Sequence, residues 1–124
     1  IFLSGVQHFA ETPDGMSRMP IVIDDVLHGL PTHWDDVKFI EGFPGKYVIL
    51  ARRKGNRWHV AGINGENTEK EITLDLSYFR DSFMTLMITD GRGDDYFTIE
   101  SDRIPNERKI KIKMKAGGGF LVIL

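Results

Sequence analysis

Three consecutive strand patterns joined by tight turns constrain this chain more than any other feature. The patterns and turns lie within residues 31–65: strands at 37–40, 46–53 and 57–63, with turns at 43–45 and 54–56. Pro44, Gly45 and Gly55 supply the backbone conformations that tight turns require. Successive strands joined so closely pair antiparallel, because a parallel pair needs a long crossover. The stretch therefore predicts an antiparallel sheet.

Five further strand patterns follow, at residues 70–76, 83–89, 96–100, 108–115 and 120–124. In the 108–115 pattern Ile110, Ile112 and Met114 alternate with lysines, which indicates a solvated strand face guarded against aggregation. The last run is apolar throughout and is typical of a central strand. About eight strands without helices between them indicate an all-β fold, a sandwich or a barrel. We favour an antiparallel β-sandwich.

The first thirty residues have a different pattern. Apolar residues at 23, 26, 27 and 30 share one helical face, and Pro20 and Gly29 are suited to the ends of a helix. They predict a helix over about 20–28, and the residues Leu3, Val6 and Phe9 suggest a second short helix ending near Thr12-Pro13. We therefore divide the chain into a helical segment, 1–31, and a sandwich, 32–124.

Composition excludes several classes of function. The chain has 124 residues, of which 41% are hydrophobic and 27% charged, as in one ordinary globular domain. It has no cysteine, which rules out disulfides and thiolate metal sites. A net charge of −2 disfavours nucleic acid and anionic membranes as partners, and no apolar run reaches the ~20 residues of a membrane helix. The start at Ile1, without a signal-peptide pattern, suggests a piece of a larger protein.

Acidic and histidine residues do not form a recognisable catalytic or metal motif. Glycosidases need two carboxyl groups flanking one bond, but the neighbours in Asp24-Asp25 and Asp35-Asp36 point apart. We interpret the first doublet as solvated surface and the second as a cap or turn. The aspartates at 90, 94 and 95 could offer calcium ligands, yet their spacing misses the EF-hand pattern and favours a hairpin turn. The four histidines are scattered, so no metal site is predicted.

Aromatic and glycine residues leave one functional alternative open. Exposed Trp34 or Trp58, or an exposed tyrosine, could stack on a pyranose ring, as in a carbohydrate-binding module. We favour a structural interpretation, with Trp58 in the core and Trp34 at the helix-to-sheet junction, because strand aromatics usually bury their apolar area. The run Gly117-Gly118-Gly119 lies between two strands and predicts a bend or bulge rather than a phosphate cradle.

The order of short motifs resembles the C-terminal end of glycoside hydrolase family 97, which contains α-glucosidases and α-galactosidases. The motifs are PTHWDD at 31–36, PG at 44–45, ARR at 51–53, RWHVAGIN at 57–64, LDLSYF at 74–79, DG at 90–91 and GGGF at 117–120. The SGVQ at 4–7 and residues 9–30 resemble the last helices of that family's catalytic barrel. One departure is Asp36-Val37, where the family leads us to expect an acidic residue followed by Thr.

The resemblance implies an inactive chain and an active parent protein. Family members have an N-terminal sandwich, a (β/α)₈ barrel and a C-terminal sandwich, and their catalytic carboxylates and calcium ligands precede the last domain. We therefore assign no catalytic, cofactor or metal residue here and expect calcium only in the parent's catalytic region. We expect a non-catalytic sandwich that buttresses its own barrel, in a periplasmic or secreted α-glycoside hydrolase. An oligosaccharide partner, bound through Trp34 or Trp58, is the alternative.

Overall fold

The computed structural model describes residues 1, 12–93 and 95–124. The chain forms two compact units, Phe2–Trp34 and a larger unit of Ile1 with Asp35–Leu124, and each is described by itself. The expected short helix over Leu3, Val6 and Phe9 lies outside the described residues. So does Asp94 of the expected turn.

The described part of the smaller unit contains two short helices, α1 (Pro13–Ser17) and α2 (Ile21–His28). The second confirms the helix expected over 20–28. The first was not predicted, and it begins at Pro13. The Thr12 hydroxyl accepts a hydrogen bond from the N–H of Gly15 at 3.0 Å, and Pro13 occupies the first turn, where its missing N–H costs nothing. In the described part of the chain, no helix is long and apolar enough to cross a membrane.

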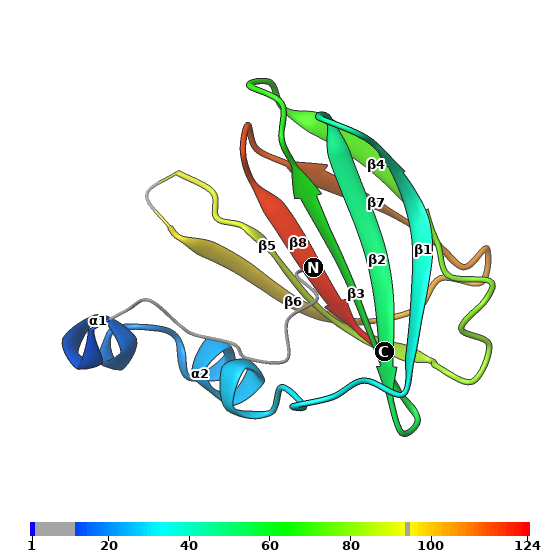
Figure 1. Cartoon of the computed structure of the whole chain (residues 1–124), viewed down its shortest axis with the longest axis horizontal. Helices are drawn as coiled ribbons and strands as arrows, with labels where there is room; N and C mark the ends of the chain where they lie inside the picture. The colour runs from blue at the N-terminus through cyan, green and yellow to red at the C-terminus, as the bar shows by residue number, and fades with distance from the viewer. Residues whose placement is uncertain (2–11, 94) are drawn as a thin grey trace. The chain divides into compact units, whose positions relative to one another are not determined.

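The larger unit is all-β and confirms the expected sandwich of eight strands (Figure 1). The strands are β1 (Asp36–Phe43), β2 (Tyr47–Lys54), β3 (Arg57–Asn64), β4 (Lys70–Asp75), β5 (Met84–Asp90), β6 (Phe97–Arg103), β7 (Lys109–Met114) and β8 (Gly119–Ile123). Six form one antiparallel sheet in the order β1-β2-β3-β8-β5-β6, and β4 pairs with β7 in a second. The apolar run at the C-terminus is a central strand, as its sequence predicts.

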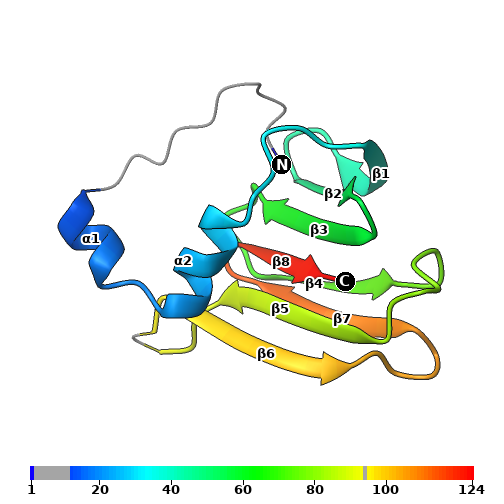
Figure 2. The ribbon, with the colours of Figure 1, turned by 90° about the horizontal axis from the view of Figure 1, so that it is seen from below.

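The core lies between the inner face of the six-stranded sheet and the two-stranded sheet, which can be followed in Figure 2. Its fully buried members come from both sheets and include Ile49, Val60, Leu74, Ile112, Met114 and Val122. The lysines of β7 at 109, 111 and 113 are exposed, which confirms the solvated face predicted from their alternation.

Polar side chains hold the loops at one end of the strands. Asn64 is fully buried, and its amide donates to the carbonyls of Thr68 at 2.8 Å and Lys115 at 2.9 Å. Asp90 ends β5 rather than lying in a free turn, and its carboxylate accepts from the N–H of Lys115 at 2.7 Å and of Gly119 at 3.1 Å. Gly117 adopts a left-handed φ of 65°, so the glycine run forms a turn into β8. These motifs are structural.

Candidate functional site

The six-stranded sheet is apolar on its outer face as well as on its inner face. Residues that pair across antiparallel strands point to the same face, so the ladder defines rows of side chains. One outward row crosses all six strands and contains only apolar residues: Phe39, Leu50, Ala61, Leu121, Ile88 and Ile99. We call this set the apolar row. A water-facing sheet surface normally carries polar side chains at such positions.

The neighbouring outward row has six positions, two of them ionisable, Arg52 and His59. The other four are Val37, Ile123, Leu86 and Ser101. Arg52 is buried, and its Nη2 donates to the backbone carbonyl of Ile1 at 2.7 Å. Burial, with a smaller contribution from the charge of Arg57, lowers the pKa of the His59 imidazole below its ordinary value. Both effects favour the neutral form of the His59 imidazole.

The two edges of the six-stranded sheet differ in character. On β1, Phe39 belongs to the apolar row and is 61% exposed, whereas Phe43 pairs with inward-facing Tyr47 and is 60% exposed. A bulge between Phe39 and Glu41 separates the two phenylalanines onto opposite faces. The opposite edge strand, β6, ends in the exposed polar residues 101–103. That strand begins at Phe97, which is 37% exposed, and follows Tyr96, which is 89% exposed, so exposed aromatic side chains lie at both edges.

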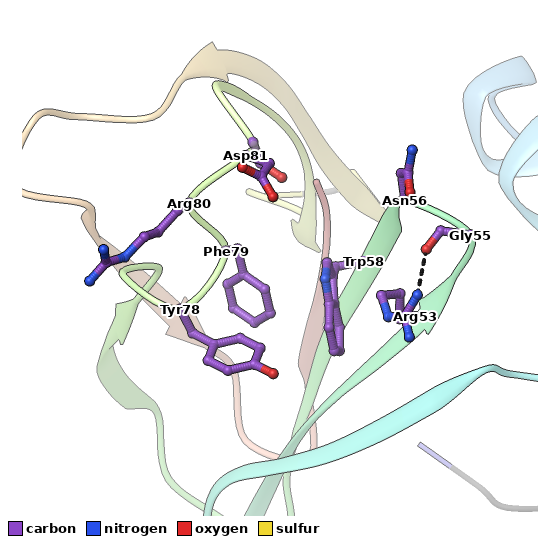
Figure 3. Close-up of a pocket in the computed structure, with 9 residues that line it drawn as sticks. Arg53, Gly55, Asn56, Trp58, Tyr78, Phe79, Arg80 and Asp81 are labelled. Carbon is purple, nitrogen blue, oxygen red and sulfur yellow. Dashed lines mark hydrogen bonds between the residues drawn. The ribbon is translucent and has the colours of Figure 1, made fainter.

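A cleft of about 520 Å³ opens beside the β2–β3 hairpin (Figure 3). It is lined by Arg53, Gly55, Asn56 and Trp58 from the hairpin and by Tyr78, Phe79, Arg80, Asp81 and Ser82 from the loop after β4. We call it the aromatic cleft, because three of its side chains form a cluster of rings. Asp81 and Tyr78 come from the loop wall, and Arg53 and Asn56 come from the hairpin wall.

The three rings of the aromatic cleft pack edge to face. Trp58 lies 5.7 Å from Tyr78 and 5.2 Å from Phe79 between ring centroids, and the guanidinium of Arg53 lies 5.7 Å from the Trp58 ring. Phe79 is core and Trp58 is half-buried, but Tyr78 is 54% exposed. The ammonium of Lys38 lies 3.4 Å from the centroid of the Tyr78 ring. Tyr78 is thus the most exposed ring of the cluster.

Arg108 holds the loop that carries Tyr78 and Phe79. Its Nη2 donates to the carbonyl of Phe79 at 2.6 Å and to that of Ser82 at 2.9 Å. Arg108 has a φ of 53°, a left-handed conformation that costs energy for a residue other than glycine. The guanidinium bonds offset that cost and fix the loop wall of the aromatic cleft.

The structure separates the residues singled out from the sequence. Trp34 is half-buried in the smaller unit, before β1, and Trp58 lines the aromatic cleft of the larger unit. Neither is fully exposed, so neither offers a wholly open ring. Sequence reasoning named Tyr78 only among several tyrosines. The signal that points to it is a Tyr-Phe pair in a loop, where two large rings cannot both turn inward.

The acidic doublets have structural surroundings. The Asp35 carboxylate accepts from the N–H of Gly55 at 2.7 Å and contacts the Lys54 ammonium at 2.9 Å, so it caps the β2–β3 turn. That hydrogen bond, and then the bond from Lys54, lower the pKa of Asp35. Asp24 lies 3.4 Å from His28 on α2. Within residues 1, 12–93 and 95–124, no three His, Cys, Asp or Glu residues are grouped so that they could hold a metal ion.

Comparison with known proteins gives consistent matches. The chain is 32% identical over 126 residues to a retaining alpha-galactosidase of Bacteroides thetaiotaomicron and 28% identical over 124 residues to a probable retaining alpha-galactosidase of Streptomyces bingchenggensis. The matches cover 97% and 99% of this chain but 19% of each relative. The chain thus spans about a fifth of the length of the curated relatives it matches.

Solved structures share the fold. A beta-arabinopyranosidase superposes with a TM-score of 0.84 at 31% identity, over 96% of this chain and 19% of that one. A glycoside hydrolase family 97 enzyme from Pseudoalteromonas sp. strain K8, in complex with acarbose, superposes with a TM-score of 0.77 at 20% identity, over 90% and 19%. At that lower identity the likeness speaks for the fold alone.

Fold and surfaces together define a β-sandwich domain whose larger sheet carries the apolar row on its outer face. The family model described as "Glycosyl-hydrolase 97 C-terminal, oligomerisation" matches residues 33–124, about three quarters of the chain. The chain belongs to this family. The family resemblance expected from the order of motifs is thereby confirmed.

Proposed function

We propose that this chain is the non-catalytic C-terminal sandwich of an α-glycoside hydrolase and that it buttresses the enzyme's own catalytic barrel through the outer face of the six-stranded sheet. Residues 1–31 are, in this proposal, the helical tail of the barrel. The observation that carries it is the apolar row, six apolar side chains in register across all six strands. Ile88 is buried, four others are half-buried and Phe39 is 61% exposed, so a second surface gains free energy by covering the area that remains in water, most of all at Phe39.

The position of Ile1 favours the barrel as the occupant of that face. Its carbonyl accepts from Arg52, an outward-facing residue in the row next to the apolar row. Ile1 therefore contacts the outer face, and it belongs to residues 1–31, which we assign to the tail of the barrel.

The relatives suggest what the whole protein does. Two curated relatives are named retaining or probable retaining alpha-galactosidases, and this chain aligns with about a fifth of each. We extend that activity to the parent, which we propose cleaves α-galactosides, with α-glucosides as the other class in the family. Calcium assistance in its catalytic region and a periplasmic or secreted location are part of the same proposal.

A second copy of the chain is the competing occupant of the outer face. The family description includes oligomerisation, and a sheet face can pack on its own symmetry mate. We favour the barrel, because of the position of Ile1 on this face. Measuring the molar mass of the 124-residue chain by light scattering tests this choice: a monomer agrees with barrel docking, and a dimer lost in F39D contradicts it.

Two phenylalanines of β1 provide a matched pair of variants for the docking surface. Phe39 is 61% exposed on the outer face and Phe43 is 60% exposed on the other face of the same strand. In the 124-residue chain, F39D and F43D should both leave the melting temperature nearly unchanged, since each ring is largely in water. In the full-length polypeptide that carries this chain, F39D should lower the melting temperature and increase proteolysis between the domains, whereas F43D should not. Equal effects of the two variants, or none from F39D, would overturn the proposal.

A further inference from the structure

We propose that the aromatic cleft is a binding site for a neutral pyranose unit of an oligosaccharide, with the Tyr78 ring as its stacking platform. This goes beyond the proposed buttressing function, because the cleft opens beside the β2–β3 hairpin and the outer face is a different surface. It narrows the sequence-based alternative, which named Trp34, Trp58 or an exposed tyrosine, to one tyrosine and one cleft.

Tyr78 has the two properties that a stacking platform needs. It is 54% exposed even with the Lys38 ammonium 3.4 Å from its ring centroid, so the ring keeps area to offer a ligand. It is also held in place, since Trp58 and Phe79 contact it edge to face at centroid distances of 5.7 Å and 5.3 Å. Trp58 itself is half-buried and engaged by Arg53, Tyr78 and Phe79. The platform is therefore Tyr78, and Trp58 supports it.

Polar groups around Tyr78 match the hydroxyl groups of a sugar. A hydroxyl both donates and accepts hydrogen bonds, so a neutral sugar needs acceptors and donors within one cleft. Asp81 is on the loop wall, and Arg53 and Asn56 are on the hairpin wall (Figure 3). Ser82 also lines the loop wall. Aromatic and apolar walls that carry a few convergent polar groups are typical of small-molecule sites. A neutral pyranose uses both kinds of group.

Arg108 makes the loop wall rigid, which lowers the entropy lost on binding. Arg108 has a left-handed φ of 53°, and its guanidinium donates hydrogen bonds to the carbonyls of Phe79 and Ser82. Its Nε also donates to the carbonyl of Leu76 at 3.4 Å, so the segment from 76 to 82, which carries Tyr78 and Asp81, is tied to one side chain. Core packing accounts for Phe79, which is 3% exposed, but it does not require the neighbouring Tyr78 to be held open.

The test is a titration of the ¹⁵N-labelled 124-residue chain with raffinose and, separately, maltotriose, each to tens of millimolar, followed by amide NMR. Y78A removes the platform. Y96A is the matched control, because Tyr96 is 89% exposed and does not line the aromatic cleft. D81A removes the acceptor and replaces Y78A if that variant does not fold. No catalytic domain is present, so the result is independent of the docking proposal.

We expect shifts confined to residues 53–58 and 78–82 with at least one of the two sugars. The apparent affinity should fall at least tenfold in Y78A and in D81A and should stay unchanged in Y96A. Absence of shifts with both sugars would overturn the proposal. So would shifts that persist in Y78A and D81A, or shifts that map away from the aromatic cleft.

Discussion

The ring of Phe120 lies over the backbone of Gly62, its partner in the β3–β8 ladder. A Cβ atom placed on Gly62 would lie 2.2 Å from Cε1 of Phe120, far inside van der Waals contact. Both residues are buried on the inner face. Glycine at 62 is therefore the condition for Phe120 to fill the core at this point.

Replacing Gly62 with alanine should destabilise the larger unit. The new methyl group forces the Phe120 ring to move within a packed core, and such overpacking costs about 1–3 kcal/mol. Urea denaturation followed by tryptophan fluorescence measures the change in free energy of unfolding. The double variant G62A/F120L provides the control, because a smaller side chain at 120 makes room for the methyl group. If G62A and F120L add without coupling, the steric account of this contact is wrong.

Removing the Asp90 carboxylate should release the loop before β8. Its oxygens accept from the N–H groups of Lys115 and Gly119, and bonds to a charged group contribute about 1.5–3 kcal/mol. D90A should lower the free energy of unfolding by that order. D95A, an exposed acidic residue of the adjacent turn, should change it by at most about 0.5 kcal/mol. A stability of the wild-type chain that falls on addition of EDTA would instead indicate a cation at these carboxylates.

Arg108→Lys should loosen the loop over 76–82. A lysine ammonium cannot reproduce the fork that joins the carbonyls of Phe79 and Ser82, so we expect a loss of about 1–2 kcal/mol. Hydrogen exchange at the Ser82 amide, which donates to the Phe79 carbonyl at 3.2 Å, should become faster. R108G and R108K both remove the guanidinium, but only R108G relieves the strain of the left-handed φ. The difference between their free energies of unfolding therefore measures that strain. A stability gain in R108G would show that strain outweighs the hydrogen bonds.

Stability should fall as the pH drops below about 6.5, the ordinary pKa of histidine. Burial lowers the pKa of His59 in the folded state, and the nearby charge of Arg57 opposes its protonation as well. Its contribution is complete above the unfolded pKa and is lost as the pH falls through the folded pKa. Melting temperatures from pH 8 to 5 should show this loss in the wild type and a weaker loss in H59Q.

The carboxylates cannot account for the same loss. Hydrogen bonds lower the folded pKa of Asp35 and Asp75, so their contributions disappear only below about pH 4. H28N is a control for the removal of an exposed imidazole. Equal pH profiles for wild type and H59Q would assign the transition near pH 6 to another group.

Local patterns predicted the strands because each pattern has one physical cause. The alternation of 108–115 requires a strand with one solvated face, and the apolar run 120–124 requires a strand buried on both sides. The start of α1 was missed, because Thr12-Pro13 can end one helix or begin the next. What marks the start of α1 is the hydrogen bond from the N–H of Gly15 to the Thr12 hydroxyl, and the proline alone does not indicate it.

The surfaces could not be predicted, because they combine residues that are distant in sequence. The apolar row exists only because β8 inserts between β3 and β5, which places Leu121 beside Ala61 and Ile88. Tyr78 lies in a loop that Arg108 holds by donating a hydrogen bond to the carbonyl of Phe79. Arg108 directly precedes β7 and is distant from that loop in sequence. Local hydrophobic patterns carry no information about either relationship.

The central claim, that the outer face is covered by the catalytic barrel, is tested most directly by thiol labelling. The chain has no cysteine, so F39C and F43C each introduce a single reporter, one on each face of β1. Both thiols should react rapidly in the 124-residue chain, where both positions are exposed. In the full-length polypeptide, the account predicts that labelling of F39C slows at least tenfold while that of F43C stays fast. Rapid labelling of F39C in the full-length polypeptide would contradict it.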